Sequence, residues 1–104
     1  MSARALRGFW EKTAEKFGRN GYKAVCAPTS IGLLNWYENI LQRTALSSFL
    51  DDCKGLTVLD VGCGVGRWAL KLGQIGANTI GIDISKNMIK EAKRRLRSMG
   101  NHQN

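Results

Sequence analysis

The chain has 104 residues, and its 16 lysines and arginines against 8 aspartates and glutamates give a formal net charge of +8. This length allows one domain with a real core, and the charge favours nucleic acid, an anionic membrane or an acidic substrate without choosing among them. The three cysteines, Cys26, Cys53 and Cys63, lack C-x-x-C spacing, which argues against a disulfide framework. The chain has a single histidine, His102, which argues against a metal centre, and no apolar run of membrane length, which argues against a membrane anchor. We therefore expect a reduced, cytoplasmic setting.

The first predicted element is an amphipathic helix over residues 4–18. Its apolar and small residues recur at helical spacing: Leu6, Phe9, Trp10, Thr13, Ala14 and Phe17. The helix can pack on the core or lie on a membrane surface, and its glutamates disfavour the membrane. Asn-Gly chemistry predicts a turn over residues 18–21. Tyr22, in the linker that follows, is expected to be a packing residue, with contact to cofactor or substrate as the alternative.

A second helix is predicted to start at Pro28-Thr29-Ser30 and to run to about Leu50, with a possible break near Ser47 and Ser48. Its apolar face includes Ile31, Leu33, Leu34, Trp36, Tyr37, Ile40 and Leu41. We expect Trp36 and Tyr37 to lie in the core rather than to stack on bases. Asp51, Asp52 and Gly55 are expected to form the loop into the next strand.

Residues 56–68 are predicted to form a strand, a glycine turn and the start of a helix, which is the first half of a nucleotide-binding βαβ unit. Gly62, Gly64 and Gly66 permit a positive φ and let a ligand approach the bare backbone. The helix after the turn offers unpaired N–H groups in its first turn. Gly76 is predicted to end this helix.

The spacing within the turn indicates the class of ligand. A dinucleotide fingerprint places its third glycine at position 67, which is Arg67 here. Asp60, two residues before Gly62, would repel a diphosphate and favour a cation. We expect Arg67 to be exposed, with contact to an anionic substrate group as the alternative. We expect Cys63 to be a small residue that the tight turn tolerates, with a reactive thiol as the alternative.

A second strand is predicted over residues 78–83. Asp83 ends it and follows Gly62 by 21 positions, near the offset at which an acid bonds ribose hydroxyls. A last helix, capped by Ser85, has apolar positions at Met88, Ile89, Ala92 and Leu96. Its opposite face is basic (Lys86, Lys90, Lys93, Arg94, Arg95 and Arg97) and is expected to be solvated, with RNA contact as an alternative.

The run Val58–Gly66, followed by Gly81–Ser85, resembles the first two motifs of class I S-adenosylmethionine-dependent methyltransferases. Asn87–Lys93 resembles the helix after the second strand of that family, so the resemblance covers about residues 56–97. It implies an α/β, partial Rossmann-like fold with two N-terminal helices followed by β-α-β-α with parallel strands. It also implies methyl transfer from S-adenosyl-L-methionine to an acceptor that the chain does not identify, with a small molecule favoured over RNA.

By this resemblance, the glycines pass the methionine part of the cofactor over the turn, Asp60 helps to hold the amino-acid end, and Asp83 binds the adenosyl ribose. The candidate cofactor-binding residues are Asp60, Gly62, Cys63, Gly64, Gly66, Asp83 and Ile84. No catalytic residue is identified. The family's leading helix often covers the cofactor site, which adds a third placement for residues 4–18.

We expect residues 1–55 to form an N-terminal helical cap region and residues 56–104 a truncated cofactor-binding Rossmann-like unit. The family's sheet has more strands than the two predicted here, so the chain resembles the N-terminal part of the enzyme. The first strand would then present an open edge that invites self-association. Two other functions stay open: a cofactor-binding or interaction fragment without turnover, and a piece of an NAD-type oxidoreductase, which Arg67 and Asp60 disfavour.

Overall fold

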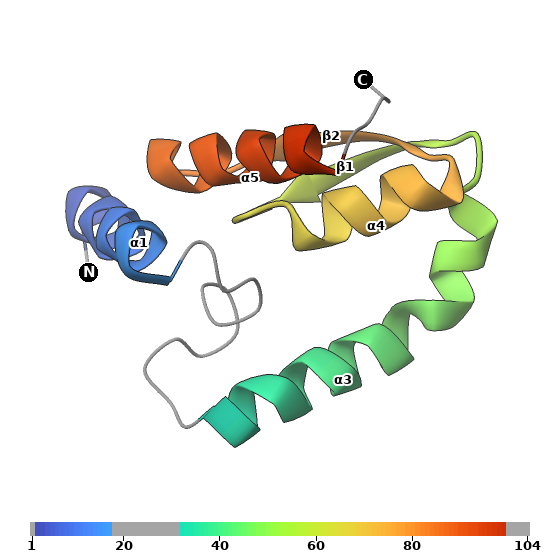
Figure 1. The fold of residues 1–104 in the computed structure, drawn as a ribbon, viewed down its shortest axis with the longest axis horizontal. Coiled ribbons are helices and arrows are strands. Elements are labelled where there is room, and N and C mark those ends of the chain that lie inside the picture. The colour runs from blue at the N-terminus through green and yellow to red at the C-terminus, as the bar shows by residue number, and fades with distance from the viewer. Residues whose placement is uncertain (1, 18–31, 100–104) are drawn as a thin grey trace.

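The structure is a computed structural model that describes residues 2–17 and 32–99. Its elements are α1 (Ala3–Phe17), α3 (Gly32–Leu50), a 3₁₀ turn η2 (Asp51–Cys53), β1 (Thr57–Val61), α4 (Arg67–Ile75), β2 (Asn78–Ile82) and α5 (Lys86–Ser98), as Figure 1 shows. The turn at 18–21, Tyr22, Cys26, the helix start at residues 28–30, Ile31, His102 and the C-terminal tail lie outside the described residues.

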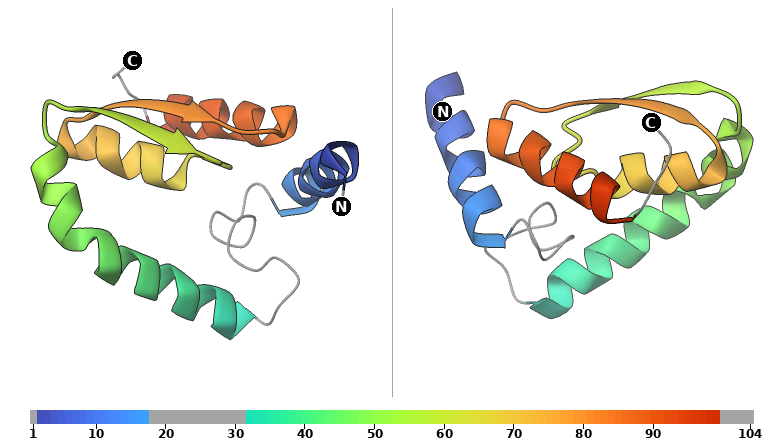
Figure 2. Two further views of the ribbon diagram at one scale, coloured as in Figure 1. Left: turned by 180° about the vertical axis from the view of Figure 1, so that it is seen from behind. Right: turned by 45° about the horizontal axis from the view of Figure 1, so that its top comes forward.

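The centre of the fold is a parallel pair of strands. Thr57 pairs with Asn78 and Val61 with Ile82, so the two strands end at the same edge. α4 connects them, and α4 and α5 both cover one face of the sheet (Figure 2, left). This arrangement confirms the predicted β-α-β-α order with parallel strands.

Local signals at the helix ends act as predicted. The Ser85 hydroxyl oxygen accepts a hydrogen bond from the Met88 amide at 3.1 Å, which caps α5. Gly76 ends α4 with a φ of +102°, a left-handed conformation that glycine adopts far more readily than other residues. α3 runs without a break to Leu50, and η2 follows at Asp51. Within α3, Ser47 donates its hydroxyl to the Thr44 carbonyl at 2.9 Å.

The core consists of two small clusters. One joins Ala14 of α1, Val65 of the glycine turn and Met88 of α5, with Trp10 packed against it. The other joins Leu50, Leu72 and Ala77 and is covered by Cys53, Val58, Trp68 and Ile75. The first cluster attaches α1 to the turn, and the second attaches the end of α3 to α4.

The core prediction for Trp36 and Tyr37 is wrong. Trp36 is 50% exposed and Tyr37 53% exposed, because no described segment covers that face of α3. In α1, Leu6 and Phe9 are exposed, and the helix buries Thr13 and Ala14 instead. None of the helices in residues 2–17 and 32–99 has both the length and the apolar character that crossing a membrane requires.

Candidate functional site

The glycine turn between β1 and α4 adopts the backbone that its sequence predicts. Gly62, Gly64 and Gly66 have φ values of +73°, +56° and +80°, all in the region that L-residues rarely enter. Space adds a second constraint at Gly66, where a Cβ would lie 3.1 Å from the Cβ of Ala92 in α5. Gly62 has no such neighbour within 4 Å, so its backbone is open on that side.

Backbone hydrogen bonds fix the turn to the end of β2. The amides of Gly62 and Cys63 both donate to the Ile82 carbonyl, at 2.8 and 2.9 Å. The Gly66 amide donates to the Cys63 carbonyl at 3.0 Å. The turn is therefore held in one conformation at the edge where both strands end.

Asp83 joins the two predicted motifs. Its Oδ2 accepts from the Gly64 amide at 2.8 Å, and its Oδ1 accepts from the Ser85 amide at 2.9 Å. Each carboxylate oxygen has two acceptor positions, so the group keeps capacity for hydroxyl donors. The carboxylate holds the turn in place and also faces the cavity beside it.

That cavity has a volume of about 450 Å³, and it is lined by Trp10, Val61, Gly62, Gly64, Ile82, Asp83, Ile84 and Met88. Four of the predicted site residues are among these: Gly62, Gly64, Asp83 and Ile84. A mainly apolar wall with one carboxylate and an open glycine backbone suits a ligand that combines a flat ring, hydroxyl groups and positive charge.

Four lining residues were missed by the sequence analysis. Val61 and Ile82 are the last residues of their strands, and ligands in parallel sheets bind at that edge, so their position was a usable signal. Met88 was predicted only as an apolar position of the last helix. Trp10 belongs to a helix far away in sequence, and helical spacing alone does not show what a side chain meets.

The predicted site residues Asp60, Cys63 and Gly66 do not line this cavity. Gly66 packs on α5, as its contact with Ala92 indicates. Asp60 pairs with Gly81 in the strand ladder. Burial raises the pKa of Asp60 above its usual value, while the Arg67 charge acts against this and the Asp83 charge adds to it. A part for Asp60, Cys63 and Gly66 in ligand binding remains a prediction.

Cys63 is buried beneath the turn. Its Sγ occupies the space above Gly81, where an added Cβ would lie only 2.9 Å from the sulfur. Burial, followed by the charges of Asp83 and Asp60, raises the pKa of the Cys63 thiol to about 11. A protonated, buried thiol favours packing over the reactive alternative.

α1 reaches this site by capping α5. Glu11 Oε1 accepts from the Lys86 amide at 2.7 Å, and Oε2 accepts from the Asn87 amide at 3.3 Å. These amides have no partner within their own helix, and the carboxylate complements the positive end of the helix dipole. The same docking carries Trp10 to the cavity wall, so α1 both packs on the core and borders the cavity.

Arg67 is not exposed, contrary to expectation. It is half-buried, and its guanidinium donates to the side-chain oxygens of Asn39 and Gln42 in α3. The sequence left this partner unknown because α3 and α4 are separate elements. No group of three or more potential metal ligands occurs among residues 2–17 and 32–99.

Comparison with known proteins places this geometry in context. The family model "Methyltransferase domain" matches residues 58–104. Magnesium-protoporphyrin O-methyltransferase of Rhodobacter capsulatus is 39% identical over 56 residues, covering 54% of this chain and 25% of that protein. Demethylmenaquinone methyltransferase of Lactococcus lactis is 32% identical over 68 residues, covering 62% of this chain and 27% of that protein.

A solved structure of magnesium protoporphyrin IX methyltransferase from Synechocystis, with bound S-adenosylhomocysteine, superposes with a TM-score of 0.67 at 23% identity. The match covers 93% of this chain and 45% of that structure. This chain therefore spans about a quarter of the curated relatives and under half of the solved structure. The likeness confirms the partial Rossmann-like fold, and the family matches confirm the resemblance of residues 58–97 to S-adenosylmethionine-dependent methyltransferases.

Proposed function

We propose that this chain, which carries the first two motifs of a class I S-adenosylmethionine-dependent methyltransferase domain, binds S-adenosylmethionine and supplies the cofactor-binding half for methyl transfer. One observation carries the proposal. Asp83 and the positive-φ glycines meet at a single cavity, at the edge where two parallel strands end. Ligands of parallel α/β folds bind at that edge.

Each part of the cofactor has a candidate neighbour. The Asp83 carboxylate would accept from the ribose hydroxyls, and Ile84 and Met88 would contact the adenine ring. The open backbone at Gly62, beside Gly64 at the cavity wall, would receive the methionine part, with Asp60 acting on its amino group through charge. Cys63 and Gly66 would act indirectly, by keeping the turn in shape.

The chemistry needs little from this half beyond positioning. The cofactor's sulfonium supplies an activated methyl group. The chain's own residues would bind it, orient it toward an acceptor and exclude water on the Trp10 side. No general base is proposed among them.

For the acceptor we propose a small molecule, in a cytoplasmic setting. The support is the names of the relatives, several of which act on porphyrins or quinones, such as the Ubiquinone biosynthesis O-methyltransferase of Pelagibacter ubique at 38% identity. RNA is the alternative, since a 23S rRNA uracil methyltransferase of Neisseria lactamica is 27% identical over 73 residues.

Self-association is part of the proposal, because β1 pairs only with β2 in the described residues. The sheet face opposite α4 and α5 carries four exposed apolar side chains, Leu59, Val61, Ile80 and Ile82. Open edges and exposed apolar patches promote pairing with another chain. A second copy would cover the β1 edge together with Leu59 and Ile80, which do not line the cofactor cavity.

A non-catalytic, cofactor-binding fragment is the second candidate function. It is favoured by the coverage of the relatives, because this chain matches 25% of the Rhodobacter capsulatus protein and 45% of the solved structure. Calorimetry with S-adenosylhomocysteine and with NAD tests cofactor binding, and saturable binding of S-adenosylhomocysteine alone is the expected result. Binding of NAD alone, or of neither ligand, contradicts the proposal. Following methyl transfer to demethylated quinone and porphyrin acceptors then separates an enzyme from a binding fragment.

A further inference from the structure

A second cavity lies between α3, α4 and α5, with a volume of about 340 Å³. We name it the basic hollow after the four cationic side chains on its wall: Arg43, Arg67, Lys71 and Arg95. Three helices contribute them, and among residues 2–17 and 32–99 no aspartate or glutamate lines the hollow. The hollow shares no lining residue with the cavity beside the glycine turn.

Side chains of α3 and the Trp68 ring hold Arg67 in place. Its two terminal nitrogens donate to the amide oxygens of Asn39 and Gln42, both neutral groups. Its Cζ lies 5.2 Å from the centre of the Trp68 ring, within the range of a cation–π contact. These contacts hold the guanidinium in a fixed position at the wall.

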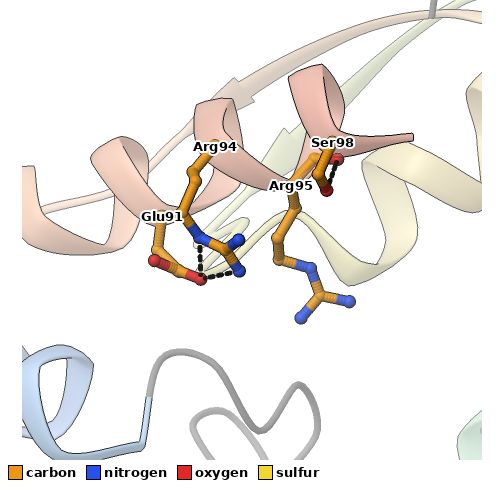
Figure 3. A network of polar contacts seen from close by, with 4 residues as sticks. All are labelled: Glu91, Arg94, Arg95 and Ser98. Carbon is orange, nitrogen blue, oxygen red and sulfur yellow. Dashed lines mark hydrogen bonds and ion pairs between the residues drawn. The ribbon is translucent and has the colours of Figure 1, made fainter. Parts of the chain in front are cut away.

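Arg95 is half-buried in the same hollow. The carboxylate of Glu91 pairs with Arg94 at 2.5 Å, and Figure 3 shows the Arg95 side chain extending away from this pair. In the part of the chain that the structure describes, the Arg95 guanidinium has no hydrogen bond or ion pair. Burial lowers its pKa, and the charges of Arg94 and Arg67 act in the same direction against that of Glu91. The group stays charged at neutral pH, since an arginine does not deprotonate there.

The result is an excess of positive charge in a partly desolvated space. The carboxylate of Asp60 interacts with Arg67 and that of Glu91 with Arg95, and Glu91 is already paired with Arg94. Like charges repel more strongly where water is excluded. An anion bound between the guanidinium groups would relieve this repulsion.

We propose that the basic hollow binds the phosphate groups of a phosphorylated ligand. Guanidinium groups bind phosphate oxygens through paired hydrogen bonds, and the hollow has room for two linked phosphates. Such a ligand is a nucleoside diphosphate or a stretch of RNA backbone, and both present phosphate oxygens to the guanidinium groups. The site is independent of the proposed cofactor cavity.

The test is calorimetric titration with pyrophosphate at constant ionic strength, using wild type, Arg95→Gln and the control Arg7→Gln. Arg7 is an exposed arginine of α1, outside the hollow. Losing one charge-assisted hydrogen bond should weaken pyrophosphate binding about ten-fold in Arg95→Gln. Arg7→Gln should match wild type, and all three proteins should bind S-adenosylhomocysteine equally.

Absence of saturable pyrophosphate binding to wild type overturns the proposal, as does equal affinity in Arg95→Gln. If Arg95→Gln does not fold, Arg43→Gln replaces it, because Arg43 is an exposed residue of α3 whose substitution leaves the core intact. If the protein binds pyrophosphate but not S-adenosylhomocysteine, the proposed function is contradicted and the proposal for the basic hollow is retained.

A parallel titration with a short oligouridylate identifies the source of the phosphate. Tighter binding than pyrophosphate, weakening steeply with added salt, assigns the hollow to RNA backbone. Tighter binding of pyrophosphate assigns it to a nucleotide. In either case the Arg95→Gln variant must bind more weakly than wild type.

Discussion

Asp83 anchors the turn and also lines the cavity in which we propose that it binds ribose. It anchors the glycine turn through the Gly64 amide, and its remaining acceptor positions face the cavity. Asp83→Ala should weaken S-adenosylhomocysteine binding by about 1.5–3 kcal/mol, because charged hydrogen bonds to the ribose hydroxyls would be lost. Calorimetry measures the affinity, with Asp51→Ala, an exposed aspartate of η2, as the control. Unchanged affinity would remove Asp83 from the site.

Gly66 tests the conformation of the turn. Gly66→Ala should destabilise the fold by about 1–3 kcal/mol, because φ is +80° and the new Cβ would press on Ala92. Gly73, inside α4 with no atom near an added Cβ, is the matched control. Gly73→Ala should stabilise by about 0.5–1 kcal/mol through helix propensity. Urea unfolding of both variants checks the opposite signs, and two changes of the same sign would contradict this account of the turn.

The raised pKa of the Cys63 thiol predicts that the free energy of unfolding depends on pH. Its pKa rises from 9.0 to about 11 on folding, so between these values the unfolded chain has lost a proton that the folded chain keeps. This contribution to stability is complete below pH 9 and is lost as the pH rises toward 11. Wild type should therefore lose more unfolding free energy between pH 9 and 11 than Cys63→Ala does. Parallel pH profiles for the two proteins would show that the thiol does not titrate in this way.

At the level of elements, the Glu11 carboxylate acts together with the apolar cluster around Ala14 to hold α1 beside the cavity. Glu11→Ala should remove the cap on α5, at a loss of about 1–2 kcal/mol, and let Trp10 leave the cavity wall. Hydrogen exchange at the Lys86 and Asn87 amides should accelerate, and S-adenosylhomocysteine affinity should fall several-fold. Glu15→Ala is the control, because Glu15 makes only a 3.4 Å side-chain contact with Asn87. Unchanged exchange in Glu11→Ala would show that α1 is held by its apolar contacts alone.

Sequence signals were sufficient where a conformation is decided locally. The alternating glycines, the Ser85 cap and the Gly76 stop each depend on neighbours within a few residues, and the structure has them as predicted. Parallel pairing then brings Asp83 to the turn. Helical spacing also gave the faces of α1 and α3, but it does not say which face meets another element. Trp10 at the cavity, Arg67 against α3 and the exposure of Trp36 all depend on docking between separate elements, which no short pattern encodes.

For the whole molecule, the packing joins the two parts that the proposed division at residue 55 separates. α1 docks on α5, and Leu50 at the end of α3 packs with Leu72 and Ala77. Residues on both sides of the division therefore share both core clusters. If residues 1–55 form a cap region, it is one that contributes to the stability of residues 56–104.

The open face of the sheet is the surface on which we propose that a second copy binds. Leu59 is 59% exposed there, beside Ile80, and neither residue lines the cavity. Leu59→Lys should place a charge on this face and shift the chain from a self-associated species toward monomer, because a buried lysine without a partner opposes association. Sedimentation over a range of protein concentrations measures the shift. Leu6→Lys, an equally apolar exposed position on α1, should leave the association unchanged. A wild-type chain that sediments as monomer at every concentration would mean that the open face and the β1 edge do not pair with a second copy.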